Sequence, residues 1–332
     1  MANKIRVAIN GFGRIGRVFL RSVLTNNQIE IVAINDLAEI GLLVHLLKYD
    51  TVHRNFDYKI VFSENSITIN NQNILVYNKA NPEDLPWKKL DIDIVIESTG
   101  FFRSRENASK HLKAGAKKVV ISAPSTDSDV KTIVMGINDG ILQSSDTIVS
   151  NASCTTNCAA PMVKLVNDIC GVNEGFLTTT HAYTGDQNIH DAPHKDLRRS
   201  RAAAQNIIPT TTGAAKAIGK IFPDLEGKIE GIGIRVPVID GSMTDLICRV
   251  ENPISVDELR NTFKTIANDK LKGVLSYTED PIVSVDIIGN PNSCIIDGLL
   301  TTVIGNLVRV VGWYDNEVGY SNRLVDLILK MA

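Results

Sequence analysis

One cysteine of this chain stands where the backbone would activate a nucleophile. Cys154 follows a run of small polar residues, 150–153, and begins a stretch whose apolar residues continue a helix through Val163 and Leu165. The first turn of a helix offers unpaired N–H groups and the positive end of the helix dipole, which favour a thiolate over a thiol. The sequence therefore predicts Cys154 as a nucleophile. Cys158, one turn further along, is interpreted as a packing residue.

A cysteine nucleophile needs a base within hydrogen-bond reach, and His181 is the best placed histidine of the chain. It closes the β-branched run 176–180 and is expected at the end of a strand. A core cysteine and a hydrogen-bonded histidine would give the same pattern without catalysis. No metal site is assigned. The cysteines at 154 and 158, and likewise His190 and His194, lack the nearby ligands that would complete a recognised zinc spacing.

Three glycines lie between the first expected strand, 5–9, and a helix expected over 17–24. In a dinucleotide-binding loop, Gly11 permits the tight turn, Gly13 lets the backbone approach a pyrophosphate, and Gly16 lets the helix pack closely. A simple turn between strand and helix is the alternative, but the position of the loop favours a dinucleotide. The N–H groups expected to face the anion belong to Arg14 and Ile15.

Asp36 follows the second expected strand, 29–34, and bears on the choice of cofactor. A carboxylate there accepts hydrogen bonds from ribose hydroxyls and repels a 2′-phosphate, which favours NAD over NADP. A turn or helix-cap role for Asp36 is the alternative.

The elements around these residues indicate two domains. A chain of 332 residues exceeds the roughly 250 to 300 residues at which a single core stops growing. The first half alternates short β-branched runs with helical stretches, which predicts a doubly wound, Rossmann-type α/β domain whose sheet is mostly parallel. Antiparallel hairpins are expected over 58–77, a helix over 107–114, and further strands at 92–97, 118–121, 132–135 and 147–149.

After about residue 152 the pattern changes to long alternating runs, such as 245–251, in which Leu246, Cys248 and Val250 share a face. This alternation predicts an α+β catalytic domain with a mostly antiparallel or mixed sheet. Ser255 and Glu258 form an expected capping box. We place the first domain at 1–152, joined by a C-terminal helix within 317–332, and the second at 153–316.

The amino-acid composition speaks against several classes of protein. Lys plus Arg number 35 and Asp plus Glu 37, so the net charge is −2 and no dedicated nucleic-acid or membrane partner is expected. The five cysteines lack paired Cys-x-x-Cys motifs and fit a reducing compartment. Neither an exported leader nor a span of about 18 apolar residues is recognised, so we expect a cytoplasmic protein.

Three segments together closely resemble the phosphorylating glyceraldehyde-3-phosphate dehydrogenase family. They are 10–17 (NGFGRIGR), 150–158 (SNASCTTNC) and 313–317 (WYDNE), and the resemblance runs from about residue 4 to residue 329. It implies that Cys154 attacks the aldehyde carbon of glyceraldehyde 3-phosphate while His181 accepts protons. Hydride then passes to NAD, and inorganic phosphate attacks the acyl thioester to give 1,3-bisphosphoglycerate.

The resemblance also assigns the remaining site residues. Around the cofactor it implies Arg14, Ile15, Asp36, Lys79, Ser122 and Asn316. Around the substrate phosphate it implies Thr184, Asp186 and Arg235, and around inorganic phosphate Ser153, Thr155, Thr212 and Gly213, with Arg199 nearby. A loop from about 183 to 207 resembles one that packs against a neighbouring subunit, which implies a homotetramer.

Two rival functions fit parts of this pattern. Erythrose-4-phosphate dehydrogenase keeps the same cysteine segment but hydrolyses its thioester; the run 210–215, suited to an attacking phosphate, speaks against it. A silent nucleotide-binding module would lack a nucleophile, base or phosphate-binding group, and each is present.

Ala192 stands where many NAD-using bacterial relatives have leucine, which leaves strict selectivity for NAD open. The working direction, glycolysis or gluconeogenesis, is also open.

Overall fold

The computed structural model describes residues 4–332, and the contacts divide the chain into two units. The first contains the chain up to Ile133, then Gly140–Ala152 and Ser321–Ala332. The second contains Val134–Asp139 and Ser153–Tyr320. The division between Ala152 and Ser153 falls directly before the segment that carries Cys154.

The first unit is built on a nine-stranded sheet of order β10-β11-β9-β8-β1-β2-β7-β6-β5. Its central strands pair in parallel, and β5, β6 and β7 form the antiparallel hairpins predicted from the sequence. The strands are β1 (Ile5–Asn10), β2 (Ile29–Asn35), β5 (Ile60–Phe62), β6 (Ser66–Ile69), β7 (Gln72–Tyr77), β8 (Ile94–Glu97), β9 (Lys118–Ile121), β10 (Lys131–Thr132) and β11 (Ile148–Ser150). A separate ribbon pairs β3 (Tyr49–Asp50) with β4 (Arg54–Asn55).

Helices α1 (Arg14–Val23), α2 (Ile40–Lys48) and α3 (Arg105–Lys113) belong to this unit. α1 begins earlier than the predicted 17–24, because Gly13 is already its N-cap and the glycine loop runs directly into the helix. The predicted strand at 132–135 is wrong beyond Thr132. There the Asn138 side chain accepts the Val134 N–H at 2.7 Å, which directs the backbone away from the sheet.

The second unit has a seven-stranded mixed sheet of order β13-β14-β12-β15-β18-β17-β16. The β12–β14 and β16–β17 pairs are parallel and the other pairs antiparallel, as the predicted mixed sheet requires. The strands are β12 (Val172–Ala182), β13 (Ile208–Thr211), β14 (Ile229–Val236), β15 (Ser242–Val250), β16 (Leu275–Thr278), β17 (Cys294–Ile304) and β18 (Leu307–Tyr314).

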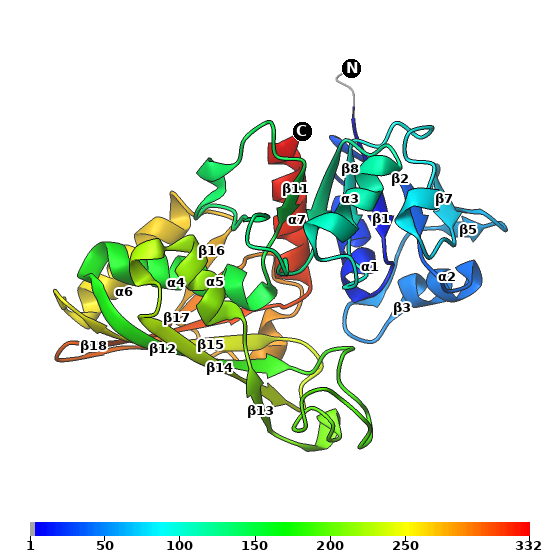
Figure 1. Cartoon of the computed structure of the whole chain (residues 1–332). Helices are drawn as coiled ribbons and strands as arrows, with labels where there is room; N and C mark the ends of the chain where they lie inside the picture. Colours follow the sequence, from blue (N-terminus) through cyan, green and yellow to red (C-terminus); the bar gives the residue numbers. More distant parts are fainter. Residues whose placement is uncertain (1–3) are drawn as a thin grey trace. The chain divides into compact units, whose positions relative to one another are not determined.

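One face of this sheet is covered by helices. Figure 1 shows α4 (Cys154–Cys170), α5 (Ala214–Ile221) and α6 (Val256–Asn268) on the same side of the strands. Leu246, Cys248 and Val250 are fully buried, which confirms the alternation read from β15. The capping box of Ser255 and Glu258 is present at the start of α6.

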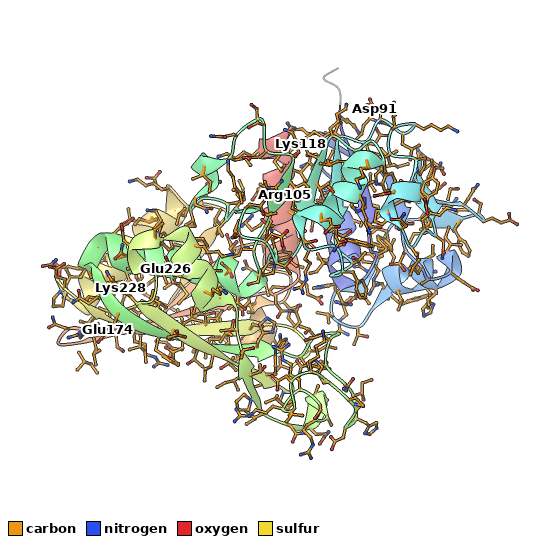
Figure 2. The ribbon with its side chains drawn as sticks, in the orientation of Figure 1. Asp91, Arg105, Lys118, Glu174, Glu226 and Lys228 are labelled. Atoms are coloured by element: carbon orange, nitrogen blue, oxygen red, sulfur yellow. The ribbon has the colours of Figure 1, made fainter. Side chains whose placement is uncertain are left out.

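Charged pairs lie at the margins of both sheets. Figure 2 labels Glu174 at the far end of β12, where it forms an ion pair with Arg249 of β15 at 2.9 Å. Lys118, also labelled there, donates to the carbonyl of Met331 at the end of α7 (Val318–Met331), and both residues belong to the first unit. Among residues 4–332, no helix is both long and apolar enough to span a lipid bilayer.

Candidate active site

The fold brings Cys154 and His181 together. Cys154 is the first residue of α4, and His181 lies near the end of β12. Their Sγ and Nε2 atoms are 3.4 Å apart. Ser153 caps α4 by accepting the Thr156 N–H at 3.1 Å, which fixes the helix start that carries the sulfur.

The partners of His181 define which ring nitrogen carries its proton. Nδ1 lies 2.7 Å from the carbonyl oxygen of Ala182. A carbonyl oxygen can only accept, so this short distance requires a hydrogen on Nδ1. The lone pair of the neutral ring is therefore on Nε2, the atom that faces Cys154. This tautomer is the one a general base needs.

Burial keeps both groups neutral in the free protein. It raises the pKa of the Cys154 thiol to about 11, although the positive charge of Arg235 and the hydrogen bonds of Thr155 act in the opposite direction. Burial, assisted by Arg235, lowers the pKa of His181 to about 3. The expectation that the helix start favours a thiolate is therefore wrong for the free protein. Part of the Cys154 surface stays accessible, but protein atoms surround the sulfur. The resulting desolvation of the thiolate outweighs the helix dipole.

Tyr314 supports the base from the other side and was not singled out from the sequence. Its ring meets that of His181 edge to face, with centroids 5.9 Å apart. Its buried hydroxyl lies 3.0 Å from Thr155 Oγ1 and 2.9 Å from Thr179 Oγ1. These contacts join α4 to β12 through one side chain. A tyrosine within a strand pattern carries no sequence signal for this role.

One residue shortly before Cys154 carries backbone strain. Ala152 has φ of 58°, the left-handed region that side chains other than glycine rarely adopt. Such a conformation costs roughly 1–2 kcal/mol and is often found at functional sites. It turns the chain sharply between β11 and α4, and so directs the start of α4.

A second group of predicted residues gathers beside His181. Arg235 is the register partner of His181 on the neighbouring parallel strand β14. Its Nη1 donates to Ala182 O at 3.0 Å and to Thr184 Oγ1 at 3.1 Å. Thr184 in turn donates to Asp186. The three residues that the resemblance places around the substrate phosphate thus form one cluster.

Arg199 joins this cluster from the loop before β13. It donates to Asp186 Oδ2 at 2.7 Å and to Thr210 Oγ1 at 2.9 Å. Burial acts to raise the pKa of Asp186, but the Thr184 hydrogen bond and the positive charges of Arg235 and Arg199 hold it below its usual value. Paired guanidinium groups in a partly buried site suit a phosphate group.

The residues predicted around inorganic phosphate lie at two helix starts. Thr212 accepts the Ala214 N–H at 3.3 Å at the beginning of α5, and a Cβ added to the adjacent Gly213 would meet open space. At α4, the Ser153 hydroxyl caps the helix and the Thr155 hydroxyl contacts Tyr314. The backbone N–H groups at these helix starts remain the natural anion donors.

The glycine loop borders a cavity of about 530 Å³ in the first unit. An added Cβ on Gly13 would enter open space, while one on Gly16 would collide with the Gly11 carbonyl oxygen. A bound pyrophosphate needs a loop without a side chain at Gly13, so that the backbone can approach it, and a helix packed closely at Gly16. The residues present therefore fit a dinucleotide. The cavity is lined by Asn10, Gly11, Gly13, Asn35, Asp36, Leu37, Lys79, Ala80, Ser98, Thr99, Phe101 and Phe102.

Other predicted cofactor residues lie around this cavity in different ways. Asp36 accepts the Phe12 N–H at 2.7 Å and the Ala38 N–H at 2.9 Å, one on each oxygen, which leaves further lone pairs for hydroxyl donors. Arg14 pairs through its side chain with Asp50 at 2.6 Å. Ser122 is not among the cavity-lining residues of the described chain; its N–H bonds to the Glu97 carbonyl.

A buried carboxylate beneath the cavity was missed by the sequence reasoning. Glu97, 1% exposed at the end of β8, accepts hydrogen bonds from His111 Nε2 at 3.1 Å, Asn10 Nδ2 at 2.6 Å and the Thr99 N–H at 2.8 Å. Trp87 donates to His111 Nδ1 at 3.0 Å, so the ring is neutral and its Nε2–H points at Glu97. The available signal was the polar residue that ends each of the buried strands β1 and β8.

Comparisons with known proteins agree along the whole chain. The family model described as "Glyceraldehyde 3-phosphate dehydrogenase, NAD binding domain" matches residues 5–105, and that described as "Glyceraldehyde 3-phosphate dehydrogenase, C-terminal domain" matches residues 153–316. The chain is 54% identical over 326 residues to glyceraldehyde-3-phosphate dehydrogenase 2 of Streptomyces avermitilis, covering 97% of each chain. It is 50% identical over 330 residues to the glyceraldehyde-3-phosphate dehydrogenases of Priestia megaterium and Geobacillus stearothermophilus, covering 99% of this chain and 98% of each relative.

Proposed function

The chain belongs to the glyceraldehyde-3-phosphate dehydrogenase family, and from that premise we propose that Cys154 and His181 carry out its chemistry. The enzyme oxidises glyceraldehyde 3-phosphate and couples the oxidation to inorganic phosphate, with NAD as cofactor, to give 1,3-bisphosphoglycerate. The observation that carries the residue assignment is the 3.4 Å approach of Cys154 Sγ to the lone-pair nitrogen of His181.

The first step follows from this geometry. The thiol proton moves to Nε2 of His181 as Sγ bonds to the aldehyde carbon, and the product is a hemithioacetal. Because the resting pair is neutral, charge develops only during the attack. The backbone N–H of Cys154, at the start of α4, and the imidazolium of His181 stabilise the oxyanion until it takes up the proton.

His181 then acts a second time. Once its first proton has passed to the hemithioacetal oxygen, neutral Nε2 accepts the hydroxyl proton back as the carbon loses hydride. When bound, NAD supplies the hydride acceptor. The remaining acyl group is a thioester on Cys154. Inorganic phosphate attacks the thioester carbon, the carbon–sulfur bond breaks, and the thiolate recovers a proton.

Two phosphate groups must be held during this sequence. We assign the substrate phosphate to Thr184, Asp186 and Arg235, which form one hydrogen-bonded cluster beside His181. The attacking phosphate is assigned to the helix starts at Ser153 with Thr155 and at Thr212 with Gly213, with Arg199 nearby. Arginine forks and helix-start N–H groups both suit phosphate oxygens.

The proposed cofactor contacts are assigned residue by residue, for each unit by itself. In the first, the N–H groups of Arg14 and Ile15 serve the pyrophosphate, Asp36 the ribose, and Lys79 and Ser122 flank the adenosine half. In the second, Asn316 serves the nicotinamide carboxamide, because an amide both donates and accepts.

A phosphate-omission assay tests the function against erythrose-4-phosphate dehydrogenase. NADH formation is measured with glyceraldehyde 3-phosphate or erythrose 4-phosphate, with and without phosphate, for the wild type and Cys154→Ala. We expect multiple turnovers only with glyceraldehyde 3-phosphate and phosphate present, and none from the variant. Equal rates without phosphate would favour thioester hydrolysis, and full activity in the variant would exclude Cys154 as nucleophile.

We also propose that the enzyme is a cytoplasmic homotetramer. Three apolar side chains of the loop before β13 are largely exposed, with 81% for Ile189, 84% for Leu197 and 71% for Ile207. Several large apolar side chains exposed on one loop support a surface that a neighbouring subunit covers. All five cysteines are free thiols, which suits a reducing compartment. Sedimentation of the native protein and cell fractionation test these two points.

A further inference from the structure

One acidic residue close to Arg199 has no part in the chemistry described so far. Asp196 lies in the same loop before β13, and its Oδ2 is 3.9 Å from Arg199 Nε, which is too far for a hydrogen bond. The side chain of Asp196 is 31% exposed and that of Arg199 only 17% exposed. The carboxyl group therefore lies on the solvent side of the guanidinium group without bonding to it directly.

Asp196 reaches Arg199 through the hydroxyl of Thr210, a nearly buried residue of β13. Thr210 Oγ1 donates to Asp196 Oδ2 at 2.6 Å and accepts from Arg199 Nε at 2.9 Å. A hydroxyl has a single hydrogen to give, and a carboxylate can only accept. Because Asp196 takes that hydrogen, the oxygen of Thr210 turns a lone pair toward the guanidinium group.

The carboxylate of Asp196 is itself held in place. Its Oδ1 accepts the Arg198 N–H at 2.8 Å, its own N–H donates to His194 Nδ1 at 2.9 Å, and its carbonyl oxygen accepts the Ser200 N–H at 3.2 Å. Hydrogen bonds from Thr210 and from the Arg198 N–H hold the pKa of Asp196 below its usual value. An ionised acceptor in a fixed turn thus faces a hydroxyl fixed in a sheet.

The bond to Thr210 decides which edge of the Arg199 guanidinium group is occupied. Nε bonds to Thr210, and Nη2 lies 3.4 Å from the carbonyl oxygen of Thr211 on the same strand. Nη1 donates to Asp186 Oδ2 at 2.7 Å. Each of the two terminal nitrogens carries a second hydrogen that can serve a phosphate oxygen. The direction of these hydrogens follows from the anchoring of Nε.

We propose that Asp196 is a positioning residue for Arg199, acting through the Thr210 hydroxyl when inorganic phosphate attacks the thioester. By taking the hydroxyl hydrogen, Asp196 makes Thr210 the acceptor that anchors Nε, and the terminal nitrogens of Arg199 are then directed at the phosphate. The inference rests on the assignment of Arg199 to the attacking phosphate proposed above.

A role of Asp196 through its charge alone predicts the opposite effect. The negative charge near Arg199 disfavours a phosphate anion, so its removal in Asp196→Ala would strengthen phosphate binding if only charge mattered. In the positioning role, Asp196→Ala leaves the Thr210 hydroxyl without a fixed direction and Arg199 without its anchor, so phosphate binding weakens. The sign of the change therefore separates the two roles.

The test isolates the phosphate step. Enzyme, NAD and glyceraldehyde 3-phosphate are mixed in a stopped-flow instrument, and the NADH burst and the later turnover are followed at increasing concentrations of inorganic phosphate. For Asp196→Ala we expect an unchanged burst and an about tenfold rise in the phosphate concentration for half-maximal turnover, with a smaller change in the maximal rate. An unchanged or lower half-saturating concentration, or loss of the burst itself, would overturn the inference.

Variants of Thr210 test the connection from the side of the sheet. Thr210→Val keeps the charge of Asp196 but removes the hydroxyl, so it should raise the half-saturating phosphate concentration as Asp196→Ala does. Asp196→Ala should then add little in the Thr210→Val background, and Thr210→Ser should behave as the wild type. Independent, multiplying effects of the two substitutions would show that Asp196 does not act through Thr210.

Two further variants complete the set. Asp191→Asn alters an exposed carboxylate of the same loop, which pairs with Arg201 at 2.8 Å, and should keep the wild-type phosphate dependence. An equal rise in Asp191→Asn would mean a general effect of the loop and would overturn the inference. If Arg199→Ala keeps normal phosphate dependence, the proposed role of Arg199 fails. If Arg199→Ala raises the half-saturating concentration while Asp196→Ala does not, the inference about Asp196 alone is refuted.

Discussion

Arg235 and His181 occupy partner positions on two adjacent parallel strands, and their side chains meet with Arg235 Nη1 3.2 Å from His181 Nδ1. One positive charge is therefore placed where it opposes protonation of the base and favours ionisation of the nucleophile. Arg235, which is proposed to bind the substrate phosphate, thus also lowers the pKa values of Cys154 and His181.

Replacing Arg235 should make Cys154 less reactive even without substrate. The positive charge lowers the pKa of the thiol, so Arg235→Gln raises that pKa and reduces the thiolate fraction. We expect the iodoacetamide alkylation rate of Cys154 at pH 8 to fall several-fold. Arg249→Gln, which removes only the exposed pair with Glu174, is the control. A rate that is unchanged or higher in Arg235→Gln would contradict the electrostatic role.

Alkylation of the free enzyme should show a high apparent pKa. Burial raises the pKa of Cys154 to about 11, so the thiolate fraction is small at neutral pH and grows about tenfold per pH unit below that value. The iodoacetamide rate, measured without NAD, should keep rising from pH 7 to pH 10. A plateau below pH 9 would show that the free enzyme already holds a thiolate.

The sequence predicted the local parts of this site and missed the parts that depend on distant contacts. The glycine loop and the helix start at Cys154 are signals carried by neighbouring residues, so both were recognisable. The approach of Arg235 to His181 depends on strand pairing between β12 and β14, and the high pKa of Cys154 depends on burial by the whole fold. Neither feature can be predicted from the pattern of neighbouring residues.

Hydrogen bonds to nearby side chains decide where two of the elements begin or end. α7 begins at Val318, within the predicted 317–332, where the Asp315 side chain accepts the first N–H groups of the helix. The strand expected over 132–135 ends at Thr132, because the Asn138 side chain competes for the Val134 N–H. Side-chain caps of this kind override the apolar pattern.

Glu97→Gln should destabilise the first unit and weaken NAD binding. The buried carboxylate accepts from His111, Asn10 and Thr99, and an amide would turn one acceptor oxygen into a donor that faces other donors. We expect the free energy of unfolding to fall by about 2–4 kcal/mol in denaturant titrations, with a higher Kd for NAD.

The control for this change is Glu83→Gln, which removes an exposed ion pair with Lys113. Exposed pairs of this kind contribute about 0–1 kcal/mol, so its unfolding should be nearly unchanged. Equal, small effects from both variants would mean that Glu97 does not organise the cavity.

Asp36→Ser should shift selectivity toward NADP. The carboxylate lines the cavity and would repel a 2′-phosphate, so its removal should raise the NADP-to-NAD ratio of kcat/KM by roughly tenfold or more. Asp57→Ser changes an exposed aspartate of the same unit and should leave the ratio constant. If both variants keep the wild-type ratio, Asp36 does not select the cofactor.

Cys154 is proposed to carry the acyl group, and a single-turnover experiment examines this intermediate itself. The enzyme is mixed with NAD and glyceraldehyde 3-phosphate in the absence of phosphate, NADH is followed in a stopped-flow instrument, and the quenched protein is digested for mass spectrometry. We expect a burst of one NADH per active site, an acyl group on the peptide that contains Cys154, and its release when phosphate is added. Continued NADH formation without phosphate, or an acyl group on another residue, would contradict the account.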